Sequence, residues 1–296
     1  MDVVERKTIG DRAFNTVNIA ILAVLSLVFV YPMWHCLMAS FSEPTSLIGL
    51  KGLLWKPNGF SLAGYKTVLQ NKNIYIGYGN TLFYVVVGTV VNMVLTILGG
   101  YCISRRGSML MRPLTLLIVF TMYVDFGLVP SFLNIRDLSL YNSRWALILP
   151  GAISTYNMIV LRTAIYAVPR SLEESAEIDG ASDWTIMWRI LIPCIKATLA
   201  VIALGYVVGH WNSWFGASIY LRDRTKFPLQ LFLQEILIAN SQSAAAGEGS
   251  SVDGFLYMDE LLKYCTIVIS TVPILCAYPF VQKYFVSGMM LGSVKG

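Results

Sequence analysis

The chain has 296 residues, of which 56% are apolar and only 13% are charged, and its 17 acidic and 22 basic residues give a formal net charge of +5. So few charges, placed between long apolar runs, exclude a disordered chain and a nucleic-acid-binding protein with clustered basic residues. The mean hydropathy of +0.62 indicates a protein that crosses a membrane several times. The 5 cysteines form no Cys-x-x-Cys pair or Cys/His cluster, so we predict neither a disulfide framework nor a metal site.

Six stretches carry few or no charges over roughly the 18 residues that a helix needs to cross a bilayer core. In chain order, the predicted spans are 14–39, 80–103, 109–132, 145–166, 196–222 and 263–283. The first has a longer apolar core than a signal peptide, so we expect it to remain as an anchor. The sequence therefore predicts an all-α membrane protein with six transmembrane helices, a membrane domain over residues 14–283, and tails at 1–13 and 284–296.

Asp125 lies inside the third predicted span. A carboxylate within a span costs roughly 2.5–3.5 kcal/mol on insertion scales, so this side chain should face protein or water. It could pair with Arg162 of the fourth span or line a path through the membrane. We favour the pair, because an ion pair would let both helices insert.

The basic residues indicate the orientation of the chain. Their totals on the two sides of the membrane are nearly equal, but the most basic short loop, residues 105–112, lies on the same side as the N-terminus. Because short cytoplasmic loops are enriched in basic residues, we expect this loop and the N-terminus in the cytoplasm. An even number of spans then places the C-terminus there as well.

The segment between spans four and five, residues 169–193, is unlike an ordinary membrane loop. Capping and helix-ending residues divide it into two predicted short helices. The first begins with a capping box of Ser171 and Glu174 and ends at Gly180, and the second is capped by Ser182 or Asp183 and ends at Pro193. The first helix is acidic and rich in small residues, which suits docking into a groove of a partner. An interfacial connector without a partner fits the same residues equally well.

The spacing in this segment closely resembles the EAA loop of ABC-importer permeases. That pattern reads Glu-Ala-Ala, three residues, Gly, nine residues and Ile-x-Leu-Pro. The matching residues here are Glu174-Ser175-Ala176, Gly180 and Ile190-Leu191-Ile192-Pro193, with Ser175 and Ile192 as the departures. The resemblance implies the type I ABC importer permease fold and a place in a bacterial cytoplasmic (inner) membrane.

Other stretches resemble the carbohydrate branch of this family, the maltose-type permeases. Span two opens with Asn80-Thr81 and closes with Tyr101 through Arg105, and Trp211-Asn212-Ser213-Trp214-Phe215 lies in the second half of span five. The N-terminal IGDRAFNTVNI and the YPMWHCLMASFS end of span one are similar to permeases of alginate, aldouronate and other polysaccharide-fragment importers. The resemblance implies a carbohydrate substrate.

By the same resemblance, the chain pairs with a second, homologous permease, and its EAA loop docks on a dimeric ATPase. The chain has no GxxxxGK(S/T) phosphate-binding loop, so we expect ATP and magnesium on the partner ATPase, no cofactor on this chain, and no enzymatic activity. The expected ATPase-coupling residues are Glu173, Glu174, Ser175, Ala176, Ile178, Asp179, Gly180, Ala181, Trp184 and Pro193.

The resemblance also implies an extracytoplasmic solute-binding protein that delivers the substrate. The longest outer loop, 222–263, has a tip of small residues that includes Ser243, Gly247 and Gly249. In the family, a loop at this position can probe the cleft of the binding protein. A disordered linker without a partner fits its composition equally well.

Five residues are candidates for the substrate path: Asn92, Asp125, Trp211, Asn212 and Trp214. Tryptophan rings and amides suit the faces of a pyranose, but helix packing or an interfacial position is the favoured reading of the two tryptophans. Asn92 could line a pore or form an interhelical hydrogen bond, and the sequence does not decide between these.

The sequence argues against two other function classes. A secondary transporter usually has ten or more spans built from an inverted repeat, and this sequence shows no such repeat. An intramembrane hydrolase would need a motif such as Gly-x-Ser-Gly, which does not occur. The secondary transporter remains the alternative.

Overall fold

The computed structural model describes residues 9–47, 52–105, 109–124, 126–246, 258, 260–276 and 279. Helices make up the described elements, and the only β contact among them is an isolated bridge between Ser42 and Phe60. The chain divides into two compact units. The first unit comprises Met1–Gln70 and Ile236–Thr271, and the second comprises Asn71–Glu235 and Val272–Gly296.

The first unit contains α1 (Ile9–Ser40), α2 (Pro44–Leu47), α3 (Ala63–Gln70) and part of the helical residues 260–276. The hydroxyl of Ser40 lies 2.7 Å from that of Tyr65, and Cys265 Sγ lies 3.4 Å from the Ser40 carbonyl oxygen. A Cβ at Gly64 would lie only 2.6 Å from Cys265 Sγ. The end of α1, α3 and the 260–276 helix therefore pack closely because glycine stands at their meeting point.

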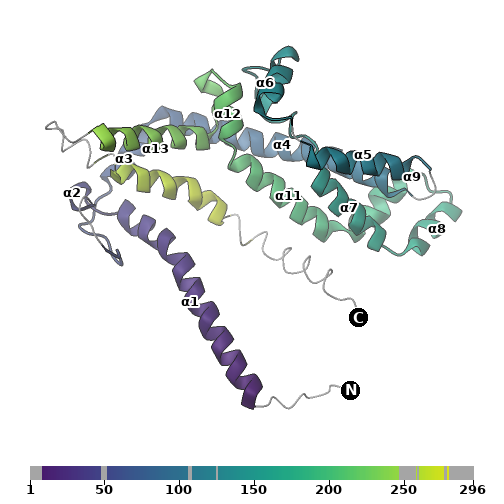
Figure 1. Ribbon diagram of the computed structural model, residues 1–296, viewed down its shortest axis with the longest axis horizontal. Helices are drawn as coiled ribbons and strands as arrows, with labels where there is room; N and C mark the ends of the chain where they lie inside the picture. The colour runs from purple at the N-terminus through teal and green to yellow at the C-terminus, as the bar shows by residue number, and fades with distance from the viewer. Residues whose placement is uncertain are drawn as a thin grey trace. The chain divides into compact units, whose positions relative to one another are not determined.

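The second unit is built around α4 (Lys72–Ser104), which packs against α7 (Thr155–Ala167) and α11 (Lys196–Trp211), as Figure 1 shows. Its main apolar cluster is formed by α4, α7, α11 and the segment after α7. Its members include Leu161, Ile165, Ile186, Leu191, Ile202 and Tyr206. This core joins three membrane helices to the segment that resembles the EAA loop.

Small and polar side chains make up much of the buried face of α4. They are Gly77, Asn80, Thr81, Gly88, Asn92, Thr96, Gly100 and Ser104. Inside a membrane, lipid solvates apolar side chains, so small and polar residues form the helix–helix contacts.

Two described helices, α1 and α4, are each long and apolar enough to cross a membrane. That number rises to four if each of two bent pairs is one span: α5 (Met111–Tyr123) with α6 (Leu128–Asp137), and Asp183–Cys194 with α11. The prediction of a continuous third helix over 109–132 is therefore wrong. The α5 helix ends at Tyr123, and α6 begins after Gly127, whose φ of 84° glycine adopts without strain.

The fourth and fifth predicted spans also contain shorter helices than expected. The stretch 145–166 begins with a 3-10 turn, η1 (Arg144–Leu147). The regular helix α7 begins only after its N-cap residue, Ser154. The α11 helix ends at Trp211 rather than at residue 222, and the short α12 (Phe215–Tyr220) follows.

The outer loop 222–263 is more regular than its small residues suggested. After a 3-10 turn, η3 (Arg224–Lys226), it forms α13 (Leu229–Ala246), so the expected flexible tip at Ser243 is helical. Alanine is the strongest helix former, which explains the continuation through Ala244–Ala246. Gly247 and Gly249 lie outside the described residues.

Candidate functional site

The segment 169–193 folds as α8 (Arg170–Ile178), a tight turn, and a second helical stretch that begins with α9 (Asp183–Thr185). Gly180 has a φ of 76° and ends α8. Its N–H donates to Glu177 O at 3.0 Å, and the N–H of Ala181 donates to Ala176 O at 2.9 Å. This pair of bonds is a Schellman motif, which requires a left-handed residue and so favours glycine.

The two predicted helix starts have different outcomes. Ser182 caps α9, because its hydroxyl accepts a hydrogen bond from Thr185 N at 3.3 Å. The predicted capping box of Ser171 and Glu174 is wrong: α8 begins at Arg170, and Pro169 stands at its N-cap without a side-chain bond. A proline suits the first turn of a helix, where its missing N–H costs nothing.

Pro193 does not stop the second helix where we predicted. The chain passes from α9 into a π-helical turn, η2 (Ile186–Leu191), and then into α10 (Ile192–Cys194), which includes Pro193. Proline crowds the carbonyl four residues before it, and the wider π turn relieves that crowding. The direction then changes by 84° into α11, so the segment lies across the end of the membrane helix.

The predicted coupling residues separate into exposed and buried groups. The side chains of Ile178 and Trp184 are 86% and 61% exposed, and the Trp184 and Trp188 rings pack 5.7 Å apart between centroids. Glu174, Ser175, Asp179, Gly180 and Pro193 are also exposed, whereas Glu173 and Ala181 are half-buried. Ala176 is buried in the chain's own core, so its coupling role stays a prediction that rests on its small size rather than on an exposed surface.

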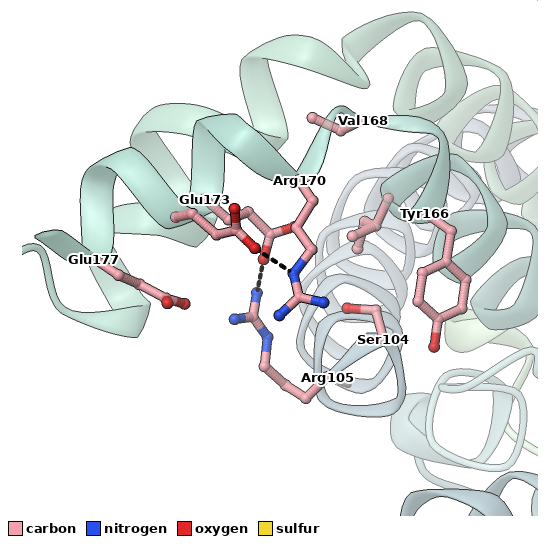
Figure 2. A pocket seen from close by; sticks show the side chains of 9 residues that line it. Ser104, Arg105, Tyr166, Val168, Arg170, Glu173 and Glu177 are labelled. Carbon is pink, nitrogen blue, oxygen red and sulfur yellow. Dashed lines mark hydrogen bonds and ion pairs between the residues drawn. The ribbon is translucent and has the colours of Figure 1, made fainter. Parts of the chain in front are cut away.

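Charged side chains cover the face of α8 that lies near the end of α4 (Figure 2). Arg105 Nη2 contacts Glu173 Oε2 at 3.1 Å, and Arg170 Nε contacts Glu174 Oε1 at 2.8 Å. A small pocket of about 80 Å³ lies between these residues, Tyr166 and the end of α4. Our sequence reading did not assign Arg105 to this site, and its place at the end of an apolar span was the available signal.

Asn92 is buried at the centre of a hydrogen-bond cluster. Its amide nitrogen donates to the carbonyls of Gly151 at 2.6 Å and Ala152 at 3.0 Å, and its amide oxygen accepts from His210 Nε2 at 2.7 Å. With the amide fully bonded inside the chain, it has the interhelical role rather than the pore-lining role.

Thr96 extends this cluster one turn along α4. Its hydroxyl lies 2.8 Å from the Tyr206 hydroxyl, which also accepts from Ser154 N at 3.3 Å. Polar side chains of α4 thus bind both α11 and the non-helical segment before α7. Non-helical backbone inside a membrane protein needs such partners.

The tryptophan cluster after α11 is only partly available to a ligand. Trp211 is buried and its ring lies 6.4 Å from that of Tyr78, which supports the packing role. Asn212 is exposed, and the exposed rings of Trp214 and Phe215 form an edge contact at 5.7 Å. Asn212 and Trp214 therefore remain accessible candidates.

Asp125 lies outside the described residues, so its predicted pairing with Arg162 is untested. Arg162 itself donates to the Ile103 carbonyl at 3.1 Å and to the Tyr166 hydroxyl at 3.2 Å. The bond to Ile103 ties α7 to the end of α4, and the bond to Tyr166 lies within α7.

On the far part of α4, three side chains hold the start of the outer loop. Asn80 donates to the carbonyls of Thr225 at 2.7 Å and Phe227 at 3.0 Å, and the Tyr84 hydroxyl donates to the Lys226 carbonyl at 2.7 Å. Thr81 accepts from Leu229 N at 2.8 Å. These contacts define an outer bracket of Asn80, Thr81 and Tyr84 with residues 225–229.

Asp223 stabilises the turn that enters this bracket. Its carboxylate accepts from the Thr225 hydroxyl at 2.7 Å and from Thr225 N at 3.0 Å. These bonds, together with Lys226, lower the pKa of Asp223 below its usual value, since they favour the charged form.

Residues 92–289 match the family described as the inner membrane component of binding-protein-dependent transport systems. The chain belongs to this family. The match includes the segment 169–193 and the helices that pack against it, so the permease fold and the exclusion of an enzyme follow from family membership.

Relatives resemble this permease over nearly its whole length. The polygalacturonan/rhamnogalacturonan transport system permease YtcP of Bacillus subtilis (strain 168) is 38% identical over 290 residues, covering 97% of this chain and 99% of that protein. The protein LplC of the same organism is 35% identical, with 98% and 97% covered.

The structural neighbours agree with this assignment. A chain of a bacterial ABC transporter involved in the import of the acidic polysaccharide alginate superimposes with a TM-score of 0.83 at 33% identity, covering 94% of this chain and 98% of that one. A chain of the alginate transporter in complex with its pentasaccharide-bound periplasmic protein gives a TM-score of 0.61 at 15% identity and shows the common fold alone. The secondary-transporter alternative is therefore set aside.

Proposed function

We propose that this chain is one of two permease subunits of an ABC importer that carries fragments of an acidic polysaccharide across the inner membrane. The observation that carries the proposal is the full-length likeness to YtcP and to the alginate importer chain. Both are named for acidic polysaccharides, galacturonan in one case and alginate in the other. A solute-binding protein delivers the substrate, and a separate ATPase supplies the energy.

The segment 169–193, called the coupling segment from here on, is the docking site for the ATPase in this proposal. Its support is the exposed pair of Ile178 and Trp184, which no other described part of the chain covers. A groove on the ATPase would bury these side chains and contact Gly180 closely. The termini and the coupling segment lie in the cytoplasm, as the basic loop 105–112 favours.

At the opposite side, the outer loop from residue 222 onward faces the solute-binding protein. The outer bracket supports this role, because it gives the start of that loop a fixed position on α4. Asn212 and Trp214 are the candidates for contact with the sugar, since both are exposed at a break between helices.

The first experiment is extraction of the native complex in mild detergent, followed by mass spectrometry of the co-purifying chains. We expect an ATPase with a Walker motif and a second permease of this family. Isolation of this chain alone from a stable extract would contradict the proposal.

The second experiment tests the substrate with the purified complex in proteoliposomes. With the cognate binding protein present, oligogalacturonate or alginate oligosaccharides should enter, whereas neutral oligosaccharides of equal length should not. Uptake of the neutral sugars alone would leave the importer function and overturn the acidic substrate.

A further inference from the structure

Arg105 follows the last residue of α4 and contacts both helices of the coupling segment. Its Nη2 lies 3.1 Å from Glu173 Oε2 on α8, and its Nη1 lies 3.4 Å from Asp183 Oδ1 at the start of α9. Figure 2 shows the guanidinium reaching from the end of α4 toward α8. One side chain therefore joins a membrane helix to two carboxylates, on α8 and α9, that are ten positions apart in the sequence.

Tyr101, one turn earlier on α4, fixes the position of this guanidinium. The guanidinium carbon lies 4.1 Å from the centroid of the Tyr101 ring, within the range of a cation–π contact. The Tyr101 hydroxyl lies 3.0 Å from both the carbonyl oxygen and the carboxylate of Asp183. The guanidinium of Arg105 therefore lies between the Tyr101 ring and the carboxylates of Glu173 and Asp183.

The contact of Arg105 with Glu173 is also the most shielded ion pair of the coupling segment. The two side chains are 26% and 21% exposed, whereas Arg170 and Glu174 of the neighbouring pair are 66% and 54% exposed. Exposed ion pairs contribute little to stability, because water and salt compete for their charges. A shielded charge that loses its partner is left uncompensated, so this pair resists separation.

Apolar packing attaches α8 to the rest of the chain only weakly. Ala176 is the one buried residue of this helix, and its larger apolar side chains, Leu172 and Ile178, are exposed. Since a single alanine buries little area, the ionic contact with Arg105 is the principal side-chain link between α8 and α4.

We propose that Arg105 is the positioning residue through which the coupling segment moves α4. This inference rests on the proposed function, because it assigns the contact that passes the movement of the ATPase to a membrane helix. The α4 helix is unbroken over 33 residues, which is about 50 Å, and the outer bracket lies on its far part. A displacement at Arg105 therefore reaches the outer loop as a rigid-body movement.

The test uses the complete importer in proteoliposomes with the variant Arg105→Met. ATP hydrolysis should continue, while the substrate carried per ATP should fall by about tenfold, a typical size for coupling between sites. Arg105→Lys keeps the charge, so its loss of transport per ATP should be smaller than that of Arg105→Met. Some loss should remain, because lysine cannot contact both carboxylates in a fork. Unchanged transport per ATP in Arg105→Met would overturn the proposal.

A double variant separates the Arg105–Glu173 contact from a general effect of removing charges. Glu173→Gln, like Arg105→Met, should lower the substrate carried per ATP. The double variant should carry no less substrate per ATP than Arg105→Met alone. Arg136→Met is the matched control, since it removes a guanidinium whose partner is the exposed Asp137 of α6. Simple addition of the two losses would contradict a shared contact.

Hydrogen exchange supplies a readout that does not depend on the substrate. In the unmodified complex, trapping nucleotide should change exchange in both α8 and residues 101–104 of α4, and in Arg105→Met it should change in α8 alone. The proposal is overturned if hydrogen exchange in residues 101–104 of Arg105→Met still changes together with that of α8. It is also overturned if the variant no longer hydrolyses ATP. If the unmodified complex hydrolyses ATP without moving carbohydrate, the proposed substrate fails, and the exchange experiment still tests Arg105.

Discussion

The backbone conformation of position 180 favours glycine before any partner is considered. Its φ of 76° completes the Schellman motif, and a Cβ built there meets no atom of the chain within 4 Å. Aspartate and asparagine visit this left-handed region more easily than other residues. The chain should therefore fold with aspartate or asparagine at position 180. The added side chain would point into the space that the ATPase would occupy.

We predict that Gly180→Asp inserts and assembles normally but loses most of its coupled transport, measured as uptake in cells or proteoliposomes. Ser139→Asp is the control, because Ser139 is exposed, also has a positive φ of 58°, and lies outside the coupling segment. Normal uptake by Gly180→Asp would count against docking at this turn.

Asn92 makes a second residue-scale prediction, this time for stability. Its replacement by leucine leaves the carbonyls of Gly151 and Ala152 and the His210 nitrogen without their partner. We expect Asn92→Leu to lower the free energy of unfolding by about 1–3 kcal/mol, the cost of unsatisfied buried polar groups. Thermal unfolding of the purified complex measures this, and Asn212→Leu, at an exposed position, should change it far less.

At the scale of the element, the small residues of α4 decide how closely α11 and α7 approach. A Cβ at Gly88 would lie 2.5 Å from His210 Nε2, and one at Gly100 would lie 2.8 Å from Leu161 Cδ2. The His210 ring is held by Asn92 and cannot move away freely. The close contact of α4 with α11 therefore depends on the missing side chain.

The same helix contains a matched pair of glycines for a test. Gly88→Ala should destabilise the protein by about 1–3 kcal/mol through overpacking. Gly79→Ala should be neutral or stabilising by up to about 1 kcal/mol, because nothing lies within 4 Å of its Cβ position and alanine favours the helix. Equal melting temperatures for the two variants would show that the α4–α11 contact is looser than described.

At the scale of the whole molecule, the orientation proposed above has a direct chemical test. In a variant that lacks the native cysteines and is expressed without its ATPase, a single cysteine at Trp184 should react with a membrane-impermeant thiol reagent only after the cytoplasmic side is opened. A cysteine at Arg222, which is exposed before the outer bracket, should react in intact cells. The reverse pattern would overturn the orientation while leaving the fold unchanged.

Both ends of α4 carry contacts with segments on opposite sides of the predicted membrane span. Arg105 binds the coupling segment, and Asn80, Thr81 and Tyr84 bind residues 225–229. The helix therefore links the expected sites of the ATPase and of the binding protein within one rigid element.

The sequence by itself determined the membrane class and the coupling segment. Apolar runs are local features, since a bilayer requires them of each span whatever its neighbours are. The spacing from Glu174 through Gly180 to Pro193 is likewise local, because glycine and proline act on their own backbone. These features could be predicted without knowing which helices meet.

Only the tertiary structure decided which side chains find each other. Asn92 meets His210 across 118 positions, and Arg105 meets Glu173 across 68. It also placed Ala176 in the core and divided the third span into α5 and α6, which the apolar pattern did not indicate. Hydropathy reports the free energy of placing each residue in lipid or in water. The outcomes above depend instead on packing between distant segments, and the apolar pattern of a single helix does not indicate which segments it will contact.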